Sequence, residues 1–401
     1  MSILVLNAGS STLKFAIFDD AANSELAGGV VEWPDSGKTA KLTFRSPNAD
    51  DRRITKDDDD VGWILRTLSE NGLDEPIRAV GHRVVHGGTD FVQPTLIDKR
   101  VSRSLERISD LAPLHNPPAL ATIKAASTTL PDAAQVAVFD TAFFADLPPR
   151  AFLYPVPYEW YAQYGIRRFG FHGISHAYCA GRAAELLGRK GDGSLRLVMC
   201  HLGNGCSATA VQGGRPVATT MGFTPMEGLM MGTRCGSIDP GILINLLQQH
   251  GFDVDRLEAS LNGRSGLLGI SGVSSDFRQV EQAAGSNNQR AQLAIEMFSD
   301  RVRSTIGSLA VTLGGVDGLV FTAGIGEYSV AMRTHVCSGL QCLGLHLDEN
   351  KNQSRSADAD IATTQSPGRI LLIRTCEERM IAQEVQRLIE RLAPVNGEEN
   401  Q

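Results

Sequence analysis

The chain has 401 residues, of which 42% are hydrophobic and 21% are charged, with a formal net charge of −7. This is the composition of an ordinary globular protein large enough for two or three domains, and the negative charge argues against broad binding to nucleic acid or to anionic membranes. The N-terminus lacks a secretory signal pattern, no stretch has the ~18 apolar residues of a membrane span, and the seven cysteines include no C-x-x-C pair. We therefore expect a cytoplasmic protein with reduced thiols.

Two apolar runs, residues 3–6 and 13–18, open the chain around the small polar stretch Asn7–Thr12. This pattern predicts a hairpin whose turn is rich in hydrogen-bond donors. With Lys14 close by, the backbone N–H groups, hydroxyls and ammonium are suited to cradle a phosphate chain. A serine-rich hairpin whose lysine points into solvent fits the same residues equally well.

The same pattern recurs nearly half a chain later. Residues 197–211 read LVMCHLGNGCSATAV, so that Asn7 aligns with His201 and Gly9 with Gly203. The segment also matches G-x-G-x-x-A, but a dinucleotide-binding fold requires a helix after this motif, whereas the residues that follow are typical of a strand. We interpret the segment as a second donor-rich hairpin turn.

A second self-similarity has a similar offset. Residues 136–142 (VAVFDTA) and 319–326 (LVFTAGIG) are both apolar strands that break into a turn of small residues. Two self-similarities at nearly the same spacing indicate a duplicated domain. Strands that alternate with helical stretches favour an α/β architecture, with a domain boundary near Pro148-Pro149.

Glycine-rich loops hold further candidate residues. The segment Gly324–Glu327 follows a strand and opens a helix, a favourable place for a nucleotide phosphate. Arg83 and Arg234 are each set among glycines, in GHRVVHGG and MGTRCG. An arginine held in such a loop is suited to clamp an anion, because its planar guanidinium meets carboxylate or phosphate oxygens in pairs. Asp276–Arg278 adds another polar pair.

Taken together, these segments give the chain a specific resemblance to the acetokinase family, within the larger group of sugar kinases, heat-shock chaperone ATPases and actin. The resemblance extends from the first strand to the last helix, and so covers essentially the whole chain. The matching stretches are Asn7–Phe15, Gly81–Gly88, His115–Pro118, Phe139–Phe143, Arg168–His176, His201–Gly205, Met221–Arg234 and Thr322–Glu327.

The resemblance implies a fold of two duplicated ribonuclease H-like (actin-like ATPase) α/β domains with a nucleotide cleft between them. The C-terminal helix of this fold returns to the first domain. We therefore expect residues 1–148 plus 380–401 to form the N-terminal domain and residues 149–379 the nucleotide-binding domain. The resemblance also implies closure of the domains around ATP and a homodimer, whose interface the sequence does not show.

The implied activity is reversible phosphoryl transfer from Mg-ATP to acetate, giving acetyl phosphate and ADP in the cytoplasm, with Mg²⁺ or Mn²⁺ as the metal. A kinase of propionate or another short-chain carboxylate is an alternative, since one methylene changes selectivity by only ~1–3 kcal/mol. An actin-like or chaperone-like ATPase is a third hypothesis. It is disfavoured because the chain ends soon after its last helix and because polymerisation would not require Arg83 and Arg234.

The resemblance assigns roles to individual residues. The metal ligands are Asn7 and Glu377, the latter chosen over Glu378 by alignment. The catalytic residues are Arg83, Asp140, His172 and Arg234. The acetate-binding residues are Arg83, Val85, Leu114, His115, Phe171 and Pro225. The ATP-binding residues are Lys14, His201, Leu202, Gly203, Asn204, Gly205, Asp276, Phe277, Arg278, Gly324, Ile325, Gly326, Glu327 and Tyr328.

Three positions carry a more specific expectation. A carboxylic acid with a pKa near ~4 is already ionised at pH 7 and needs no general base. We therefore expect Asp140 to orient an arginine and help to place the metal rather than to transfer a proton. Cys376 and Tyr328 replace residues that are commonly Asn in this family, and both changes are suited to tune nucleotide affinity.

Overall fold

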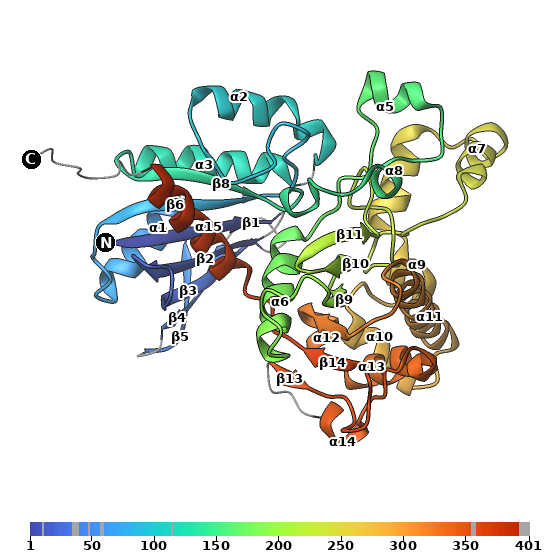
Figure 1. Cartoon of the computed structure of the whole chain (residues 1–401). Helices are drawn as coiled ribbons and strands as arrows, with labels where there is room; N and C mark the ends of the chain where they lie inside the picture. Colours follow the sequence, from blue (N-terminus) through green and yellow to red (C-terminus); the bar gives the residue numbers. More distant parts are fainter. Residues whose placement is uncertain are drawn as a thin grey trace, which may run out of the picture. The chain divides into compact units, whose positions relative to one another are not determined.

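The structure is a computed structural model that describes residues 1–9, 12–33, 40–46, 49–56 (backbone only), 60–113, 115–353 and 358–392. The chain divides into two compact units (Figure 1): unit 1 comprises Met1–Ala142 and Cys376–Gln401, and unit 2 comprises Phe143–Thr375. The chain crosses from unit 1 to unit 2 after Ala142 and returns to unit 1 after Thr375. The domain limits predicted from the sequence lie near these two crossings and stay a prediction. Among the described residues, no helix is both long enough and apolar enough to cross a bilayer.

Unit 1 is built on a mixed sheet with the strand order β5-β4-β3-β2-β1-β6-β8-β7. The first five strands form an antiparallel meander, β6 and β8 continue the sheet parallel to β1, and β7 is antiparallel to β8. The predicted first hairpin is confirmed, with Asn7 opposite Lys14. The strands are β1 (Ser2–Ala8), β2 (Thr12–Asp19), β3 (Glu25–Glu32), β4 (Ala40–Ser46), β5 (Ala49–Lys56), β6 (Ile77–Val84), β7 (Thr95–Leu96) and β8 (Ala134–Phe139).

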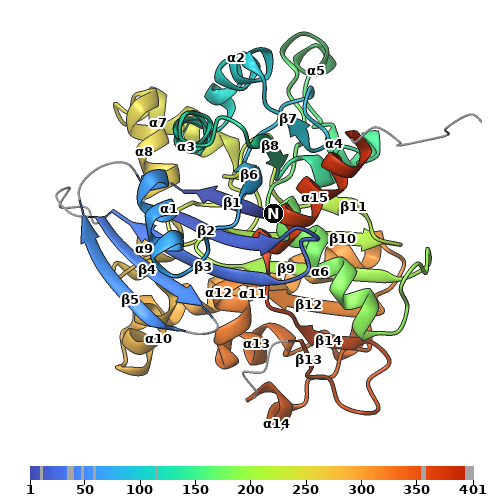
Figure 2. The ribbon, with the colours of Figure 1, turned by 90° about the vertical axis from the view of Figure 1, so that its left-hand side faces the viewer.

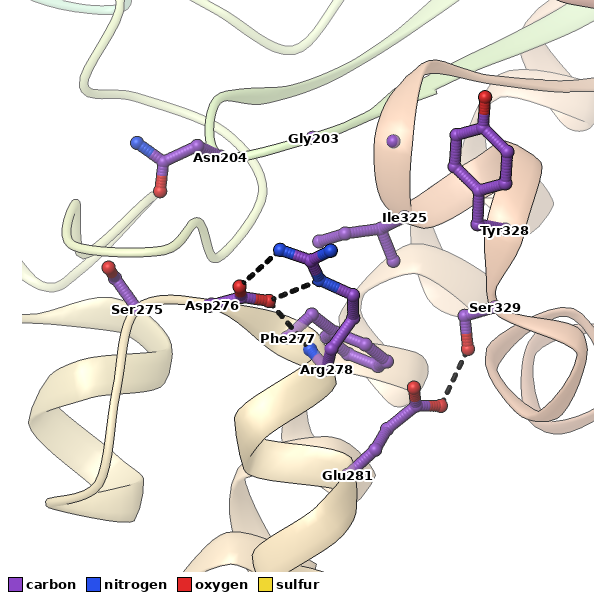
Figure 3. A pocket seen from close by; sticks show the side chains of 11 residues that line it. Gly203, Asn204, Ser275, Asp276, Phe277, Arg278, Glu281, Ile325, Tyr328 and Ser329 are labelled. Carbon is purple, nitrogen blue, oxygen red and sulfur yellow. Dashed lines mark hydrogen bonds and ion pairs between the residues drawn. The ribbon is translucent and has the colours of Figure 1, made fainter.

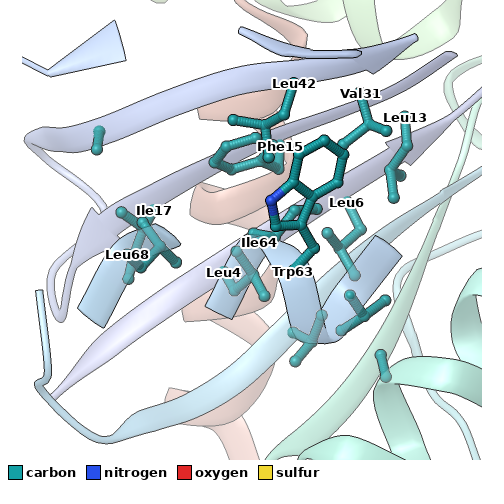
Figure 4. Close-up of a cluster of buried hydrophobic side chains, with 14 of the residues drawn as sticks. Leu4, Leu6, Leu13, Phe15, Ile17, Val31, Leu42, Trp63, Ile64 and Leu68 are labelled. Carbon is teal, nitrogen blue, oxygen red and sulfur yellow. The ribbon is translucent and has the colours of Figure 1, made fainter. Parts of the chain in front are cut away.

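Helices cover both faces of this sheet (Figure 2). The helices α1 (Asp60–Glu70) and α3 (Asn116–Thr129) pack on one face, where Trp63 lies among apolar side chains of the meander such as Leu6 and Phe15 (Figure 4). The opposite face carries α15 (Glu377–Leu392). Every residue of β1 is buried, as expected for a strand covered on both sides.

The last helix approaches the sheet closely at Gly81 in β6. A Cβ atom at this position would lie 2.7 Å from Ile381 Cγ2 and 2.8 Å from Val385 Cγ2, both on α15. A glycine is therefore required for α15 to lie against β6 at this depth. Glu377 is the first residue of α15 and lies one turn before Ile381.

Unit 2 repeats this plan with the strand order β11-β10-β9-β12-β14-β13. The helices α6 (Gly173–Leu186) and α11 (Gln289–Thr312) pack against its sheet, α6 through Cys179, Ala180 and Ala183. The strands are β9 (Arg196–Leu202), β10 (Cys206–Gln212), β11 (Arg215–Thr219), β12 (Gly318–Thr322), β13 (Ala359–Asp360) and β14 (Arg369–Leu372).

The two sheets share a core topology of three antiparallel strands followed by two parallel ones, which confirms the predicted duplication and fold class. The first self-similarity is also confirmed, because β9 and β10 occupy the places of β1 and β2. The second pairing is wrong in detail. The strand β8 is the second parallel strand of its sheet, whereas β12 is the first, so that β12 corresponds to β6 and β8 to β14.

Shorter elements complete the two units. In unit 1 these are α2 (Lys99–Arg107) and η1 (Ser109–Leu111), and η2 (Ala142–Phe144) lies at the first crossing. In unit 2 they are α4 (Pro149–Phe152), α5 (Tyr158–Tyr164), α7 (Pro240–Gln249), α8 (Val254–Gly263), α9 (Gly266–Ser271), α10 (Phe277–Gly285), α12 (Ala323–Tyr328), α13 (Val330–Cys337), η3 (Leu340–Leu343) and α14 (Glu349–Asn352).

We predict that Gly81→Ala lowers the free energy of unfolding by ~1–3 kcal/mol, because the added methyl group overpacks the contact between β6 and α15. Urea denaturation followed by circular dichroism measures this change. Gly181→Ala in α6 is the matched control, since its Cβ would meet nothing within 4 Å. It should be neutral or stabilising by up to ~1 kcal/mol. A Gly81→Ala protein as stable as the wild type would contradict the packing argument.

Candidate active site

Three charged or polar side chains meet where the parallel strands of unit 1 end. Asn7 lies at the end of β1, Arg83 near the end of β6, and Asp140 directly after β8. Parallel strands end at the same edge of a sheet, which is where α/β proteins bind ligands. Arg83 donates from Nε and Nη2 to Asp140 Oδ2, at 3.1 and 2.6 Å, and from Nη1 to Asn7 Oδ1, at 3.2 Å.

This ion pair is largely withdrawn from solvent. The Asp140 side chain is 1% exposed and that of Arg83 is 16% exposed. Burial alone would lower the pKa of Arg83, but the negative charges of Asp140 and Glu377 raise it above its ordinary value, so Arg83 stays cationic. The two hydrogen bonds from Arg83 to Asp140 are the contact that Asp140 would need in order to orient the guanidinium.

Two carboxylates lie beside this pair at the start of α15. Asn7 Nδ2 donates to Glu377 Oε2 at 3.3 Å and to Glu378 Oε1 at 3.1 Å. Within the described ranges, no group of three or more His, Cys, Asp or Glu side chains could hold a metal ion. Mg²⁺ bound with a nucleotide usually takes only one or two protein carboxylates, together with water and phosphate oxygens. Glu377 and Glu378 fit that kind of site.

Two of the remaining predicted residues of unit 1, Val85 and His115, lie on segments that contact each other. Val85 follows β6, and His115 precedes α3. These segments are held together because His86 N–H donates to Asn116 Oδ1 at 3.1 Å and Asn116 Nδ2 donates to the His86 carbonyl at 3.0 Å. Leu114 lies outside the described residues, and Lys14 has an exposed side chain.

Unit 2 contains a pocket of about 870 Å³, a size common for small-molecule sites (Figure 3). Eight of the predicted ATP-binding residues line it, while Ser275, Glu281 and Ser329 are lining residues that the sequence analysis missed. The predicted residues that line the pocket are Gly203, Asn204, Asp276, Phe277, Arg278, Gly324, Ile325 and Tyr328. The other predicted ATP-binding residues of unit 2 (His201, Leu202, Gly205, Gly326 and Glu327) are not among its lining residues.

Polar groups in the pocket are tied to one another. Arg278 donates to Asp276 from Nε at 3.1 Å and from Nη2 at 2.6 Å, and these hydrogen bonds lower the pKa of Asp276. Asp276 also caps α10 by accepting from the Arg278 backbone N–H. Ser329 donates to Glu281 at 2.6 Å. Together with Ile325 and Tyr328, these groups offer apolar faces and directed hydrogen bonds, as a nucleoside requires.

A histidine cluster lies behind the Gly203–Gly205 turn. The rings of His172 and His201 stack with centroids 4.1 Å apart. Ser207 Oγ forms hydrogen bonds with His172 Nδ1 at 2.9 Å and with His176 Nε2 at 2.8 Å. Burial holds the pKa of His176 well below its ordinary value, so this histidine is neutral at physiological pH.

Arg234 lies beside this cluster. Its Nη1 donates to the Pro225 carbonyl at 2.8 Å. A Cβ atom on Gly205 would lie 3.2 Å from two atoms of the His172 ring and 3.8 Å from Arg234 Nη1. The predicted residues His172, Gly205, Pro225 and Arg234 are therefore brought together in unit 2, and the buried Phe171 directly precedes His172.

Two sheets with a common core strand order, polar turns at the strand ends and a pocket of small-molecule size define a duplicated α/β protein with a ligand site. The chain belongs to the acetokinase family, whose model matches residues 2–383. It is 47% identical to an acetate kinase of Cyanothece sp., over 97% of this chain and 99% of that one. It is 43% identical to an acetate kinase of Methanosarcina acetivorans, over 97% of each.

Solved structures agree with this assignment. The acetate kinase of Porphyromonas gingivalis superposes with a TM-score of 0.89 at 38% identity, covering 97% of this chain and 99% of that one. A propionate kinase of Francisella tularensis superposes with a TM-score of 0.87 at 40% identity, covering 96% and 98%. The resemblance stated from the sequence is confirmed.

We predict that Asp140→Asn lowers the turnover of ATP-dependent acyl phosphate formation by ~10²–10³-fold, because Arg83 loses the charge that orients it. We also expect the Mg²⁺ concentration for half-maximal rate to rise. Steady-state kinetics at varied Mg²⁺ measures both. Asp192→Asn removes a surface carboxylate paired with Arg189 and is the control, with unchanged kinetics expected. Near-normal turnover of Asp140→Asn with unchanged Mg²⁺ dependence would contradict the orienting role.

Proposed function

We propose that this chain catalyses the reversible transfer of the γ-phosphoryl group of ATP to acetate, giving acetyl phosphate and ADP. The observation that carries the proposal is its near-full-length identity of 47% to proteins named acetate kinase. The physical arrangement supports it, because unit 1 presents a fixed guanidinium and two carboxylates, and unit 2 presents a nucleotide-sized pocket beside a second guanidinium.

The proposed mechanism depends on positioning and charge. The transferred phosphoryl group spreads negative charge over three oxygens, so that catalysis consists mainly of alignment and neutralisation. In this proposal Arg83 and Arg234 bind the acetate carboxylate and the phosphoryl group, His172 donates a hydrogen bond to the same group, and Asp140 keeps Arg83 in place. Acetate is already ionised and gives up no proton.

Mg²⁺ or Mn²⁺ would be held by Asn7 and Glu377, and when bound it neutralises phosphate charge. Asn7 Oδ1 accepts a hydrogen bond from Arg83, and its Nδ2 donates to both carboxylates, which supports a role in placing Glu377. In unit 2 the pocket residues would bind the nucleoside, with the Gly203–Gly205 turn and Lys14 assigned to the phosphates. Val85, Leu114, His115, Phe171 and Pro225 would surround the acetate methyl group.

A kinase of propionate or another short-chain acid is the second candidate, favoured by the likeness to a propionate kinase structure. We predict that acetate has the highest kcat/KM among acetate, propionate and butyrate, by ~10-fold or more over propionate. Trapping the acyl phosphate with hydroxylamine in parallel assays measures this order. A higher kcat/KM for propionate than for acetate would make propionate the preferred substrate. Absence of acyl hydroxamate with every acid would overturn the proposed activity.

We place the protein in the cytoplasm and infer a homodimer. None of the described cysteines is joined to another by a disulfide, as in a reducing compartment. Helix α7 has no buried residue although it is largely apolar, and Ile242, Ile244 and Leu247 are 48%, 55% and 43% exposed. Exposed apolar surface of this kind is typical of a protein interface.

We predict that Ile244→Asp weakens the homodimer, because a carboxylate on α7 would have to be desolvated against the second copy. Light scattering at micromolar concentration should give a dimer mass for the wild type and a monomer mass for the variant. Val311→Asp, an exposed apolar position on α11, is the control and should remain dimeric. A monomeric wild type would refute the dimer, and a dimeric Ile244→Asp would exclude α7 from its interface.

A further inference from the structure

Glu327 belongs to the predicted nucleotide-binding segment, but its carboxylate is engaged away from the pocket. Its Oε1 accepts from the backbone N–H of Ala323 at 2.9 Å and of Thr375 at 3.2 Å, and from the Thr322 hydroxyl at 3.5 Å. The residue is not among those that line the pocket. Glu327 therefore joins the turn between β12 and α12 to the last residue of unit 2.

One end of this link fixes the nucleotide pocket. Ala323 has φ +64°, a left-handed conformation that residues with a Cβ rarely adopt. Such a backbone persists only where surrounding contacts hold it, and the hydrogen bond from the Ala323 N–H to Glu327 is one of them. The residues that follow, Gly324, Ile325 and Tyr328, line the pocket.

The other end fixes the crossing from unit 2 to unit 1. Ile373 N–H donates to the Phe321 carbonyl at 3.1 Å, which fastens this segment along β12. Thr375 Oγ1 donates to Ser175 Oγ at 2.9 Å, and Ser175 Oγ forms a 2.8 Å hydrogen bond with His201 Nδ1. Thr375 is thus held by both its backbone N–H and its hydroxyl.

The chain itself carries this restraint into unit 1. Glu377 follows Thr375 by two residues, and two residues span at most ~7 Å between Cα atoms. This limit holds for any arrangement of the two units. A fixed Thr375 therefore confines the start of α15, where Glu377 and Glu378 lie, to the neighbourhood of the turn that lines the nucleotide pocket.

We propose that Glu327 and Thr375 form a clasp that positions Glu377 for the metal ion accompanying the nucleotide, so that Glu327 is a positioning residue and not a nucleotide ligand. The inference rests on the proposed function, because it takes Glu377 as a metal ligand. It assigns to the Glu327 carboxylate the task of coupling the nucleotide turn to the metal site through the covalent crossing.

Three variants test the clasp, with Mn²⁺ as the probe ion and two binding measurements. Electron paramagnetic resonance measures the affinity of the protein–ADP complex for Mn²⁺, and calorimetry in EDTA measures the affinity for metal-free ADP. Glu327→Ala should weaken Mn²⁺ binding ~10–100-fold, as expected when support of a metal ligand is lost. Glu327→Gln keeps an accepting oxygen and should remain close to wild type.

Thr375→Val keeps the backbone N–H but loses the hydrogen bond to Ser175, so we expect a smaller but measurable loss of Mn²⁺ affinity. Metal-free ADP should bind to Glu327→Gln and Thr375→Val as tightly as to the wild type, and any loss of ADP affinity in Glu327→Ala should be much smaller than its loss of Mn²⁺ affinity. Glu349→Ala is the matched control, since Glu349 accepts from Thr334 outside the clasp, and both affinities should be unchanged.

Each contrary result has a distinct meaning. Weaker binding of metal-free ADP to Glu327→Ala with unchanged Mn²⁺ affinity would make Glu327 a nucleotide ligand and overturn the clasp. If Glu327→Ala loses affinity for Mn²⁺ and for metal-free ADP to the same extent and is also less thermally stable, Glu327 has only a structural role. If Glu327→Ala does not fold, Thr375→Val decides, and unchanged Mn²⁺ affinity there overturns the proposal. Binding needs no turnover, so a wild type that forms no acyl phosphate refutes the proposed activity separately.

Discussion

The paired charges of Arg83 and Asp140 are the interaction on which the candidate site of unit 1 depends. A buried carboxylate is costly unless a partner balances it, and here the guanidinium does so with two hydrogen bonds to one oxygen. The pair exists because β6 and β8 are parallel and end at the same edge of the sheet. Sheet topology thus places a fixed cation beside Asn7 and the carboxylates that begin α15.

The two units share a core strand order, but the turn after the first strand has different polar residues and contacts in each unit. In unit 1 Asn7 contacts a guanidinium and two carboxylates, whereas at the aligned position in unit 2 His201 stacks on His172 and bonds to Ser175. The same strand order therefore supports a guanidinium beside two carboxylates in one unit, and in the other the pocket that we propose binds the nucleotide. This division explains why the repeat is visible in the apolar strands and weak in the polar residues between them.

The family, the two hairpins and most of the residues that line the pocket could be predicted from the sequence, because glycine turns and apolar strands leave a local sequence pattern. The pairing of β8 with β12 failed because both strands are followed by small residues although they hold different places in their sheets, so that local similarity does not determine strand order. Ser275, Glu281 and Ser329 reach the pocket through tertiary packing, which no local motif records. The direction of the Glu327 side chain likewise depends on Thr375, far along the chain.

The central claim is that Arg83 and Arg234, one from each unit, bind the same small anion during transfer. A crystal structure of the protein with acetate, Mg-ADP and aluminium fluoride, a mimic of the transferring phosphoryl group, tests this directly. The account predicts that a guanidinium nitrogen of each arginine lies within ~3.2 Å of the bound acetate or fluoride, with Arg83 still paired to Asp140. Either arginine on an outer surface remote from the nucleotide would contradict it.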